Sequence, residues 1–353
     1  MTKVIVGMSG GVDSAAAAYL LKEAGYEVIG LTLRTDSQEG RCCEIDDARA
    51  AAWKLHIRYY APNVISDFEE KVKKPFFNAY LQGRTPNPCI ECNRYVKWDR
   101  MMYFMSVLDA DYVATGHYAF VEQLENGRFT VRQASFAEKD QTYMLYKLTQ
   151  EQLAHTLMPL GKYSKPEVRS IAEQAGLAVA QKRDSQEICF VTDGNYADYI
   201  EKDPTLTAPE AGNFVDENGK IMGKHHGIIH YTVGQRKGLG IAAGYPVYVT
   251  RINTAANEVV LGEEKSLYSS EIRCTDLNYL SIPGLESGEK IRARVKIRYH
   301  HEGEWASIKP DTGETVRIIF EKPVRAATPG QSAVFYDEEN RVIGGGIITN
   351  SSR

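Results

Sequence analysis

The chain has 353 residues, 43% of them hydrophobic and 25% charged, with a formal net charge of −4 at pH 7. This length predicts two or three domains with an ample core, and the acidic balance excludes indiscriminate binding to nucleic acid. Six cysteines are too few for a disulfide scaffold, and no apolar run approaches the roughly 18 residues of a membrane span. We therefore expect a cytoplasmic enzyme with no membrane partner, since Met1 leads straight into a strand rather than a signal peptide.

Strands and helices alternate through the first half of the chain. Apolar, β-branched runs predict strands over 4–7, 26–33, 57–60 and 111–115. Helices are expected over 15–24, 46–55, 67–81 and 97–108, and a capping box at Ser164 and Glu167 begins another that runs to about residue 175. This order predicts an α/β fold with a doubly wound parallel sheet, which binds ligands at the carboxyl ends of its strands.

The sequence changes character after about residue 200. Asp203-Pro204 and Ala208-Pro209 interrupt the chain, and the remainder is rich in glycine and in short alternating segments. Strands are expected over 247–252, 258–261, 291–299, 316–320 and 333–336. Their hairpin spacing predicts a β-rich end that forms a small barrel.

A six-residue turn joins the first strand to the first helix. It reads Ser9-Gly10-Gly11-Val12-Asp13-Ser14, and it leaves backbone N–H groups at a helix N-terminus, where an anion is stabilised. The turn lacks the lysine of the ordinary P-loop and resembles the S-G-G-x-D-S loop of the ATP pyrophosphatases. That resemblance implies cleavage of ATP between the α and β phosphates and transfer of AMP to a substrate oxygen. The alternative is a glycine turn without a ligand.

Two cysteine motifs suggest thiol chemistry. Cys89 and Cys92 follow a proline-rich loop and precede a predicted helix, with Arg94 and Lys97 nearby to favour the thiolate. Half of a zinc site and a buried structural pair are the alternatives for these two thiols. Cys189 follows Lys182 and Arg183 in a charged loop. Alone it would suggest a core cysteine, but beside the other motifs it favours a redox or sulfur-carrying thiol.

Several motifs occur in the order found in one family. They are the turn at 9–14, T-P-N-P-C-x-x-C-N from Thr85, T-G-H-Y from Thr115, K-D-Q from Lys139, D-S-Q-E-I-C-F from Asp184, and the run from Tyr231 to Gly240. From Gly7 to Gln331 the chain thereby resembles the tRNA-specific 2-thiouridylases. The resemblance implies a Rossmann-like PP-loop ATP pyrophosphatase domain over 1–202, a small central domain over 203–266 and a tRNA-binding β-barrel over 267–353.

By this resemblance the chain is an ATP-dependent tRNA-uridine 2-sulfurtransferase. It would replace the C2 oxygen of the wobble uridine, position 34, with sulfur and release AMP and pyrophosphate. The resemblance implies ATP contacts from Gly7, Met8, Ser9, Gly10, Gly11, Val12, Asp13, Ser14, Leu33 and Gly116. Asp13 would be a direct or indirect partner of Mg²⁺, since this hard cation prefers carboxylate oxygens.

The family resemblance also assigns the sulfur chemistry. Cys92 matches the nucleophile, and Cys189 matches the cysteine that carries a persulfide donated by an upstream sulfur-donor protein. A Cys92–Cys189 disulfide would form as sulfur is released, and reduction would reset the pair. Some members have aspartate at the position of Cys89. Here the three thiols Cys89, Cys92 and Cys189 could instead hold a [4Fe–4S] cluster with one open iron, so both routes stand as alternatives.

Recognition of tRNA must be local on an acidic protein. The resemblance implies that Asn87, Pro88 and Cys89 lie beside a flipped-out target base, and that tRNAs for Lys, Glu and Gln are the substrates. It implies further tRNA contacts for His117, Lys139, Asp140, Gln141, Arg298, Tyr299 and Gln331. Basic residues alternate with apolar ones over 292–298, which predicts one basic strand face or, alternatively, a solvated edge strand.

Two other functions share part of this pattern. An amidating or argininosuccinate-forming ligase would share the ATP loop without needing the cysteine motifs. A non-enzymatic RNA-binding protein would need neither the loop nor the thiols, and tRNA-dependent release of pyrophosphate distinguishes it from an enzyme.

Overall fold

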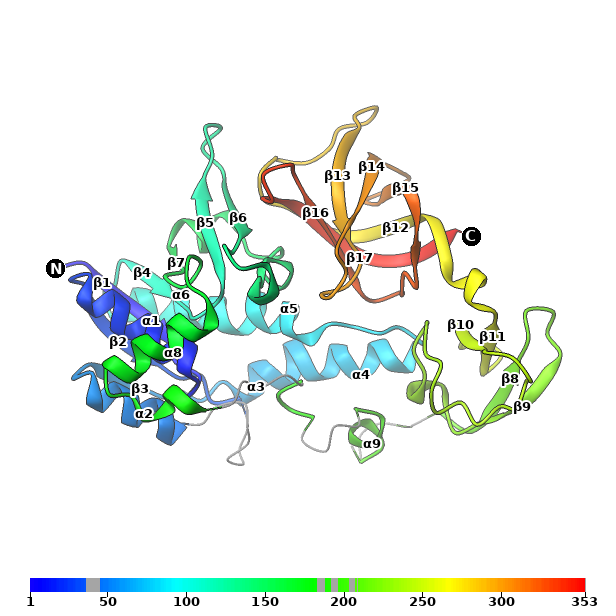
Figure 1. Ribbon diagram of the computed structural model, residues 1–353, viewed down its shortest axis with the longest axis horizontal. Helices are drawn as coiled ribbons and strands as arrows, with labels where there is room; N and C mark the ends of the chain where they lie inside the picture. Colours follow the sequence, from blue (N-terminus) through cyan, green and yellow to red (C-terminus); the bar gives the residue numbers. More distant parts are fainter. Residues whose placement is uncertain (36–44, 183–187, 192–195, 203–206, 208, 353) are drawn as a thin grey trace.

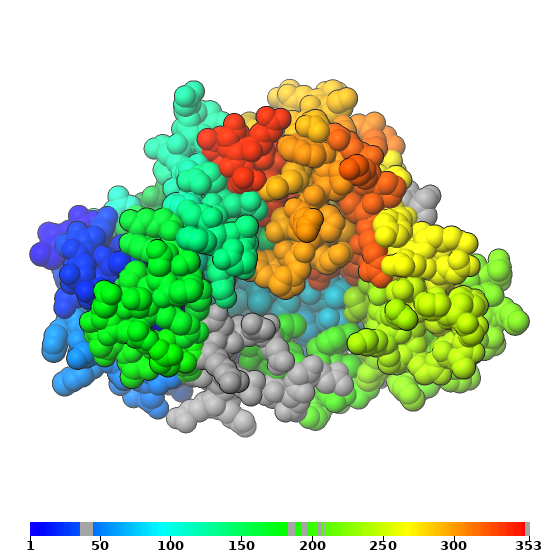
Figure 2. Space-filling model, viewed as in Figure 1, coloured from blue at the N-terminus to red at the C-terminus, as the bar shows by residue number. Residues whose placement is uncertain are grey.

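The computed structural model of the protein describes residues 1–35, 45–182, 188–191, 196–202, 207 and 209–352. Figure 1 shows an α/β unit at the N-terminal end, a small β-rich unit in the yellow-green part of the chain, and a barrel at the C-terminal end. In the space-filling view the barrel abuts both other units (Figure 2). Among the described residues, no helix is long and apolar enough to cross a membrane.

Five parallel strands form the sheet of the α/β unit, in the order β3-β2-β1-β4-β7. They are β1 (Lys3–Gly7), β2 (Glu27–Leu31), β3 (Arg58–Tyr60), β4 (Tyr112–Ala114) and β7 (Thr156–Leu157). The predicted parallel sheet is confirmed, although β7 was not anticipated because two residues carry no periodicity. The order reverses at β1, so the turn after β1 lies at the switch point where such sheets bind ligands.

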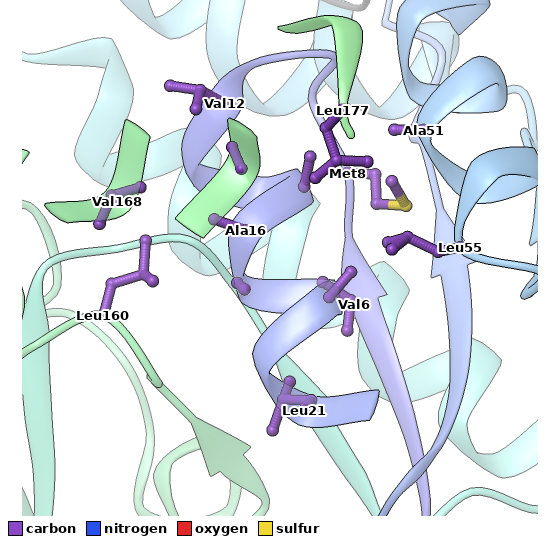
Figure 3. Packing of buried hydrophobic residues seen from close by; sticks show 14 of the residues in the cluster. Val6, Met8, Val12, Ala16, Leu21, Ala51, Leu55, Leu160, Val168 and Leu177 are labelled. Atoms are coloured by element: carbon purple, nitrogen blue, oxygen red, sulfur yellow. The ribbon is translucent and has the colours of Figure 1, made fainter. Parts of the chain in front are cut away.

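Alternate residues of β1 pack into two separate hydrophobic cores. Val4 and Val6 pack with α1 (Val12–Glu23), α2 (Ile45–Lys54) and α8 (Lys165–Gln174), as Figure 3 shows around Val6. Ile5 points to the other face and packs with Met101 of α6 (Asp99–Val107). Helices therefore cover both faces, which confirms the doubly wound arrangement.

Two long helical runs cross the middle of the molecule. The first comprises α3 (Ile65–Phe68), the π-helical η1 (Glu69–Lys73) and α4 (Lys74–Leu81), and the second comprises α5 (Pro88–Cys92), the π-helical η2 (Asn93–Trp98) and α6. Cys89 and Cys92 thus lie inside a helix, and the prediction that they precede one was wrong. Asn87 accepts a hydrogen bond from the Cys89 N–H at 3.1 Å, and Pro88 occupies the first helical position.

Shorter elements connect these runs to the barrel. A hairpin is formed by β5 (Ala119–Gln123) and β6 (Phe129–Gln133). Helical turns follow as η3 (Ala137–Lys139), η4 (Thr142–Met144), α7 (Gln150–Ala154), η5 (Ala178–Gln181) and α9 (Tyr196–Glu201). The capping box of Ser164 and Glu167 is confirmed at the start of α8.

The small unit is a four-stranded sheet in the order β10-β11-β8-β9. Its strands are β8 (Gly212–Val215), β9 (Ile221–His225), β10 (Tyr248–Asn253) and β11 (Glu258–Gly262), with the turn η6 (Ile228–His230) against them. The predicted strands over 247–252 and 258–261 correspond to β10 and β11. Phe214, Val249 and Val259 are fully buried at its centre.

The predicted C-terminal barrel is confirmed as a closed barrel in the order β12-β15-β14-β13-β16-β17. After the turn η7 (Glu264–Leu267) come β12 (Tyr268–Tyr279), β13 (Ile291–Lys296), β14 (Glu304–Pro310), β15 (Val316–Arg325), β16 (Ser332–Tyr336) and β17 (Val342–Ser352). The strand expected over 291–299 ends at Lys296, because the chain turns there and the His301 N–H bonds to Arg298 O.

The hairpin β5–β6 fastens the α/β unit to the barrel. Arg128 donates to the carbonyl oxygens of Leu280 and Tyr279, each at 2.8 Å, and Thr130 donates to Val342 O at 2.6 Å. Figure 1 shows the hairpin standing beside β16. These contacts hold the two units in one relative position.

The central strand should dominate the stability of the α/β unit. Ile5 is fully buried, so Ile5→Ala leaves a cavity and is expected to lower the free energy of unfolding by about 2–5 kcal/mol. Urea unfolding followed by circular dichroism measures this loss. Ile221→Ala, on a side chain that is 61% exposed, is the control and should change stability by less than about 0.5 kcal/mol. Equal losses in the two variants would contradict the packing described for β1.

Candidate active site

The turn from Met8 to Gly11 lies between β1 and α1 at the carboxyl end of the central strand. Ser14 Oγ accepts from the Ser9 N–H at 3.1 Å and donates to Gly11 O at 3.1 Å, which closes the turn. Gly10 has a φ of 77°, in the region that favours glycine. The predicted anion-binding geometry is therefore built from the first turn of α1 and the loop that precedes it.

Asp13 lies in the first turn of α1 and is held from two sides. Lys165 Nζ lies 2.8 Å from both carboxylate oxygens, and the Tyr118 hydroxyl donates to Oδ1 at 2.7 Å. Lys165 is the first residue of α8, whose start is fixed by its capping box. Lys165 thus engages this carboxylate in the structure, and the partnership of Asp13 with Mg²⁺, direct or indirect, stays a prediction.

A second ammonium group reaches the same turn. Lys182 donates to Gly10 O at 3.3 Å and forms an ion pair with Asp47 of α2. Burial lowers the pKa of Lys182. The sequence suggested that Lys182 serves the thiol of Cys189, whereas its ammonium lies at the phosphate loop. Two lysines from distant parts of the chain therefore add positive charge beside the predicted phosphate site.

Gly116 packs directly on the first turn of α1. A Cβ at this position would lie 2.7 Å from Asp13 C and 2.7 Å from Ser14 N, both backbone atoms. Only glycine permits this approach, so the segment after β4 supports the loop. This contact places Gly116 beside the phosphate loop, and its expected contact with the nucleotide stays a prediction.

Cys92 and Cys189 pack against one hydrophobic cluster, although they are far apart in the chain. Cys92 is 7% exposed and Cys189 is half-buried, and Leu33 packs against the same cluster. Leu33 also contacts the core beneath the sheet. Both thiols and the residue expected to line the adenine therefore belong to one continuous hydrophobic cluster, and Leu33 lies just after β2.

The ring of Phe190 anchors the segment that carries Cys189. It packs edge-to-face on Phe76 at 5.3 Å and on Phe68 at 5.6 Å between ring centroids. Both partners belong to the helical run α3–α4, and edge-to-face contacts of this kind are favourable beyond simple burial. Residues 184–187 of the D-S-Q-E-I-C-F motif lie outside the described residues, and so do Cys42 and Cys43.

The thiols do not form a metal centre in this arrangement. Within the described ranges, no three His, Cys, Asp or Glu side chains gather as a group able to hold a metal ion. Cys89, Cys92 and Cys189 therefore do not fit a [4Fe–4S] cluster as they lie, and the C-x-x-C pair does not complete a zinc site.

Family models match three successive parts of the chain. They are described as tRNA methyl transferase HUP domain over residues 2–193, tRNA methyl transferase PRC-barrel domain over 204–263, and aminomethyltransferase beta-barrel domain over 269–348. The chain is 51% identical to the tRNA-specific 2-thiouridylase MnmA of Lachnoclostridium phytofermentans, over 99% of each chain. It is 52% identical to the protein of the same name from Acetivibrio thermocellus, over 98% of this chain and 99% of that one.

The chain belongs to the tRNA-specific 2-thiouridylase family. It is accordingly an enzyme of tRNA modification with sulfurtransferase activity. The descriptions of the family models name methyl transferases, but the relatives that match over the full length are thiouridylases. The pair of cysteines at the carboxyl edge of the sheet agrees with sulfur chemistry.

Two of the residues expected to contact tRNA, Tyr299 and Gln331, bond the barrel of this 2-thiouridylase to the α/β unit. The Tyr299 hydroxyl donates to Asp140 O at 3.0 Å, and Gln331 Nε2 donates to Thr85 O at 2.8 Å. Gln141 accepts from the Tyr118 N–H at 3.0 Å, which links the K-D-Q motif to the partner of Asp13. Lys139 is partly exposed in η3.

Asp140 is the least available of these residues. It is 5% exposed, and its carboxylate accepts from the Thr142 hydroxyl at 2.8 Å. Burial raises the pKa of Asp140. Its side chain therefore organises the K-D-Q turn from within the protein.

The expected basic face of the strand over 292–298 is only partly correct. Arg292, Arg294 and Lys296 alternate with buried residues in β13 as expected. Arg298 lies beyond the strand, is half-buried, and donates to Arg325 O at 2.9 Å. Arg292 pairs with Glu321, which reduces the local positive charge.

The sequence analysis missed the roles of Tyr118, Lys165 and Lys182. Each contacts the phosphate loop from an element distant in the chain. Lys165 belongs to the capping-box motif, and Tyr118 to T-G-H-Y, but neither motif names Asp13 as a partner. Only the assembled sheet reveals these contacts.

His117 should remain neutral across the physiological range. Its imidazole bonds to the Thr115 hydroxyl at 2.8 Å and lies against Trp98, 5.5 Å between centroids. Burial, with a smaller effect of Lys97, lowers the pKa of His117 to about 3. Because the folded-state pKa is depressed, the contribution of His117 to stability is complete above the unfolded value of about 6.5 and is lost as pH falls below it.

Imidazole NMR signals measure this titration directly. The His117 signal, assigned by its loss in His117→Asn, should show a neutral ring from pH 8 to about pH 5. Titration of that signal near pH 6.5 would contradict the enclosed environment described for the ring.

Proposed function

We propose that the enzyme thiolates C2 of the wobble uridine, position 34, in tRNA by adenylation and persulfide transfer. One observation supports the proposal: Cys92 and Cys189, far apart in the chain, pack on the same hydrophobic cluster, and Leu33, which follows β2 next to the strand that carries the phosphate loop, packs on it too. An activating site and a sulfur-delivering site are both needed, because the C2 oxygen of uridine is a poor leaving group.

The first step activates the uridine. Its O2 attacks the α-phosphorus of ATP, the bond to the oxygen that bridges the α and β phosphates breaks, and pyrophosphate leaves. Backbone N–H groups of the turn hold the pyrophosphate, and the ammonium groups of Lys165 and Lys182 offset its negative charge. Mg²⁺ bound with ATP would add to this neutralisation, with Asp13 as its proposed direct or indirect partner.

The second step transfers sulfur. The terminal sulfur of a Cys189 persulfide attacks C2, the C2–O bond breaks, and AMP departs with the former O2. The Cys92 thiolate then attacks Cys189 Sγ, which breaks the bond to the transferred sulfur and leaves that sulfur on C2. The product is a Cys92–Cys189 disulfide, and a dithiol reductant supplies two electrons to restore both thiols.

The partners and the location follow from this chemistry. A persulfide-bearing donor protein loads Cys189, and tRNAs for Lys, Glu and Gln are the proposed substrates by family resemblance. We propose the cytoplasm as the location, which is supported by the tRNA substrate and by the need for a reducing environment. Asn87, Pro88 and Cys89 lie at the start of α5 and are proposed to flank the flipped base.

Asp13→Ala should abolish tRNA-dependent release of pyrophosphate and formation of 2-thiouridine. It removes the carboxylate that fixes Lys165 and Tyr118 at the phosphate loop. Asp46→Ala is the control, because Asp46 is exposed in the same unit and pairs only with Arg49 among the contacts described; it should retain activity. Normal formation of AMP by the Asp13 variant would overturn the role proposed for this residue.

Cys92→Ser and Cys189→Ser should each eliminate 2-thiouridine while tRNA-dependent release of pyrophosphate continues. A serine hydroxyl cannot replace a thiolate in either role near neutral pH. Cys89→Ser should keep measurable thiolation with a sulfur-loaded donor, because the proposed transfer uses only the other two thiols. Mass spectrometry of tRNA nucleosides decides the outcome, and parallel loss of iron and activity in Cys89→Ser would contradict the persulfide route.

A further inference from the structure

A buried lysine lies between the cysteine-bearing helix and the barrel. Lys147 is 2% exposed, and its ammonium contacts carboxylates from two different units. Nζ lies 2.6 Å from Glu91 Oε1 on α5 and 2.5 Å from Asp276 Oδ2 on β12. One side chain therefore joins residues that are far apart in the chain, and Glu91 immediately precedes Cys92.

The barrel side of this bridge has an unusual backbone. Asp276 has a φ of 50°, and the pairing of β12 with β17 shifts register between Thr275 and Asn278. Non-glycine residues seldom adopt this conformation. At this irregularity, Asp276 and Asn278 both contact the segment around Lys147. Asn278 Nδ2 donates to Tyr146 O at 2.6 Å and to Leu148 O at 3.1 Å. Lys147 is thus held between two anchored neighbours.

The charges of the bridge are mutually dependent. Burial by itself would lower the pKa of Lys147, but the carboxylates of Glu91 and Asp276 raise it above its usual value. Removal of the Lys147 ammonium leaves the carboxylates of Glu91 and Asp276, which are 24% and 50% exposed, without the cation that joins them. The bridge therefore favours a single position of α5 relative to the barrel.

Further contacts tie the start of the same helical run to the barrel. The Thr85 N–H donates to Pro329 O at 2.8 Å, and Gln331 donates to Thr85 O. Within the segment that carries Lys147, the Tyr143 hydroxyl donates to Ser332 O at 2.8 Å. Hydrogen bonds to the barrel therefore hold Thr85, just before α5, as well as the segment that carries Lys147.

We propose that Lys147 is a positioning residue for sulfur transfer. It holds Glu91 near Asp276, so that the Cys92 thiol keeps its place on the cluster shared with Cys189 while the barrel engages tRNA. The inference rests on the proposed function of Cys92 as the thiol that resolves the persulfide. It assigns to the barrel a second task, the placement of the nucleophile, in addition to binding of tRNA.

Alkylation of Cys92 tests the positioning without any assay of activity. In Lys147→Met, modification of Cys92 by iodoacetamide, followed by peptide mass spectrometry, should be faster by about tenfold or more, because α5 opens more readily. Cys274 is fully buried in the barrel core and reports global unfolding in the same sample. It should stay protected.

Arg128→Met is the matched control. Arg128 also joins the α/β unit to the barrel, but from the connection between β5 and β6, and its described hydrogen bonds go to Leu280 and Tyr279 rather than to α5. This variant should alter Cys92 alkylation by less than about twofold, even if its melting temperature falls. Equal acceleration in both variants would show that Lys147 acts only by general docking of the barrel, and this would overturn the proposal.

The activity assay separates positioning from binding. Lys147→Met should lower the rate of 2-thiouridine formation by about tenfold while tRNA-dependent release of pyrophosphate and the Kd for tRNA stay within about twofold of wild type. If both rates fall together, the positioning role is wrong. If wild type releases no pyrophosphate with tRNA, the proposed function fails, whereas the alkylation result still stands.

A variant that removes all three charges of the bridge controls for misfolding. The triple variant Glu91→Gln, Lys147→Met, Asp276→Asn removes all three charges together, so no unpaired charge remains buried. It should fold and still show the faster alkylation of Cys92 with Cys274 protected. Protection of Cys92 at the wild-type level in this folded variant would refute the proposal.

Discussion

Edge-to-face packing of Phe190 on Phe68 and Phe76 determines where Cys189 lies. The described segment around Cys189 spans only residues 188–191, and its position rests on one ring inserted among aromatic side chains of α3 and α4. The same cluster receives Cys92 from α5 and Leu33 from the end of β2. Apolar packing, rather than a bond between the sulfur atoms, therefore brings the two thiols onto one cluster.

The phosphate loop is stabilised differently, by a local turn and by charges from distant residues. Its backbone is shaped locally by Ser14 and glycine, but its electrostatic surroundings come from distant residues. Lys165 and Lys182 bring positive charge to the turn, and Asp13 and Asp47 pair with them. When a polyphosphate binds, each ammonium can exchange a carboxylate for a phosphate oxygen, so the cations need not be buried without a counterion.

Local signals in the sequence were reliable guides to the fold. The apolar run of β1, the glycine turn and the capping box of Ser164 act over a few residues, and the structure has them where they were expected. The position of Cys89 and Cys92 within α5 was missed, because the cap by Asn87 and the proline at the first turn were interpreted as an extended loop. The contacts of Lys165 and Lys147 depend on the assembled units, and no local pattern encodes them.

The contacts between the hairpin and the barrel have a consequence for evolvability. Arg128, Thr130 and Asn126 all donate to main-chain carbonyl oxygens of the barrel region, at Tyr279, Leu280, Ser281 and Val342. A carbonyl acceptor persists whatever side chain the residue carries. The outer surface of the barrel can therefore accumulate substitutions without losing these bonds to the α/β unit. Such a joint lets the surface of the barrel diverge while its position relative to the α/β unit is preserved.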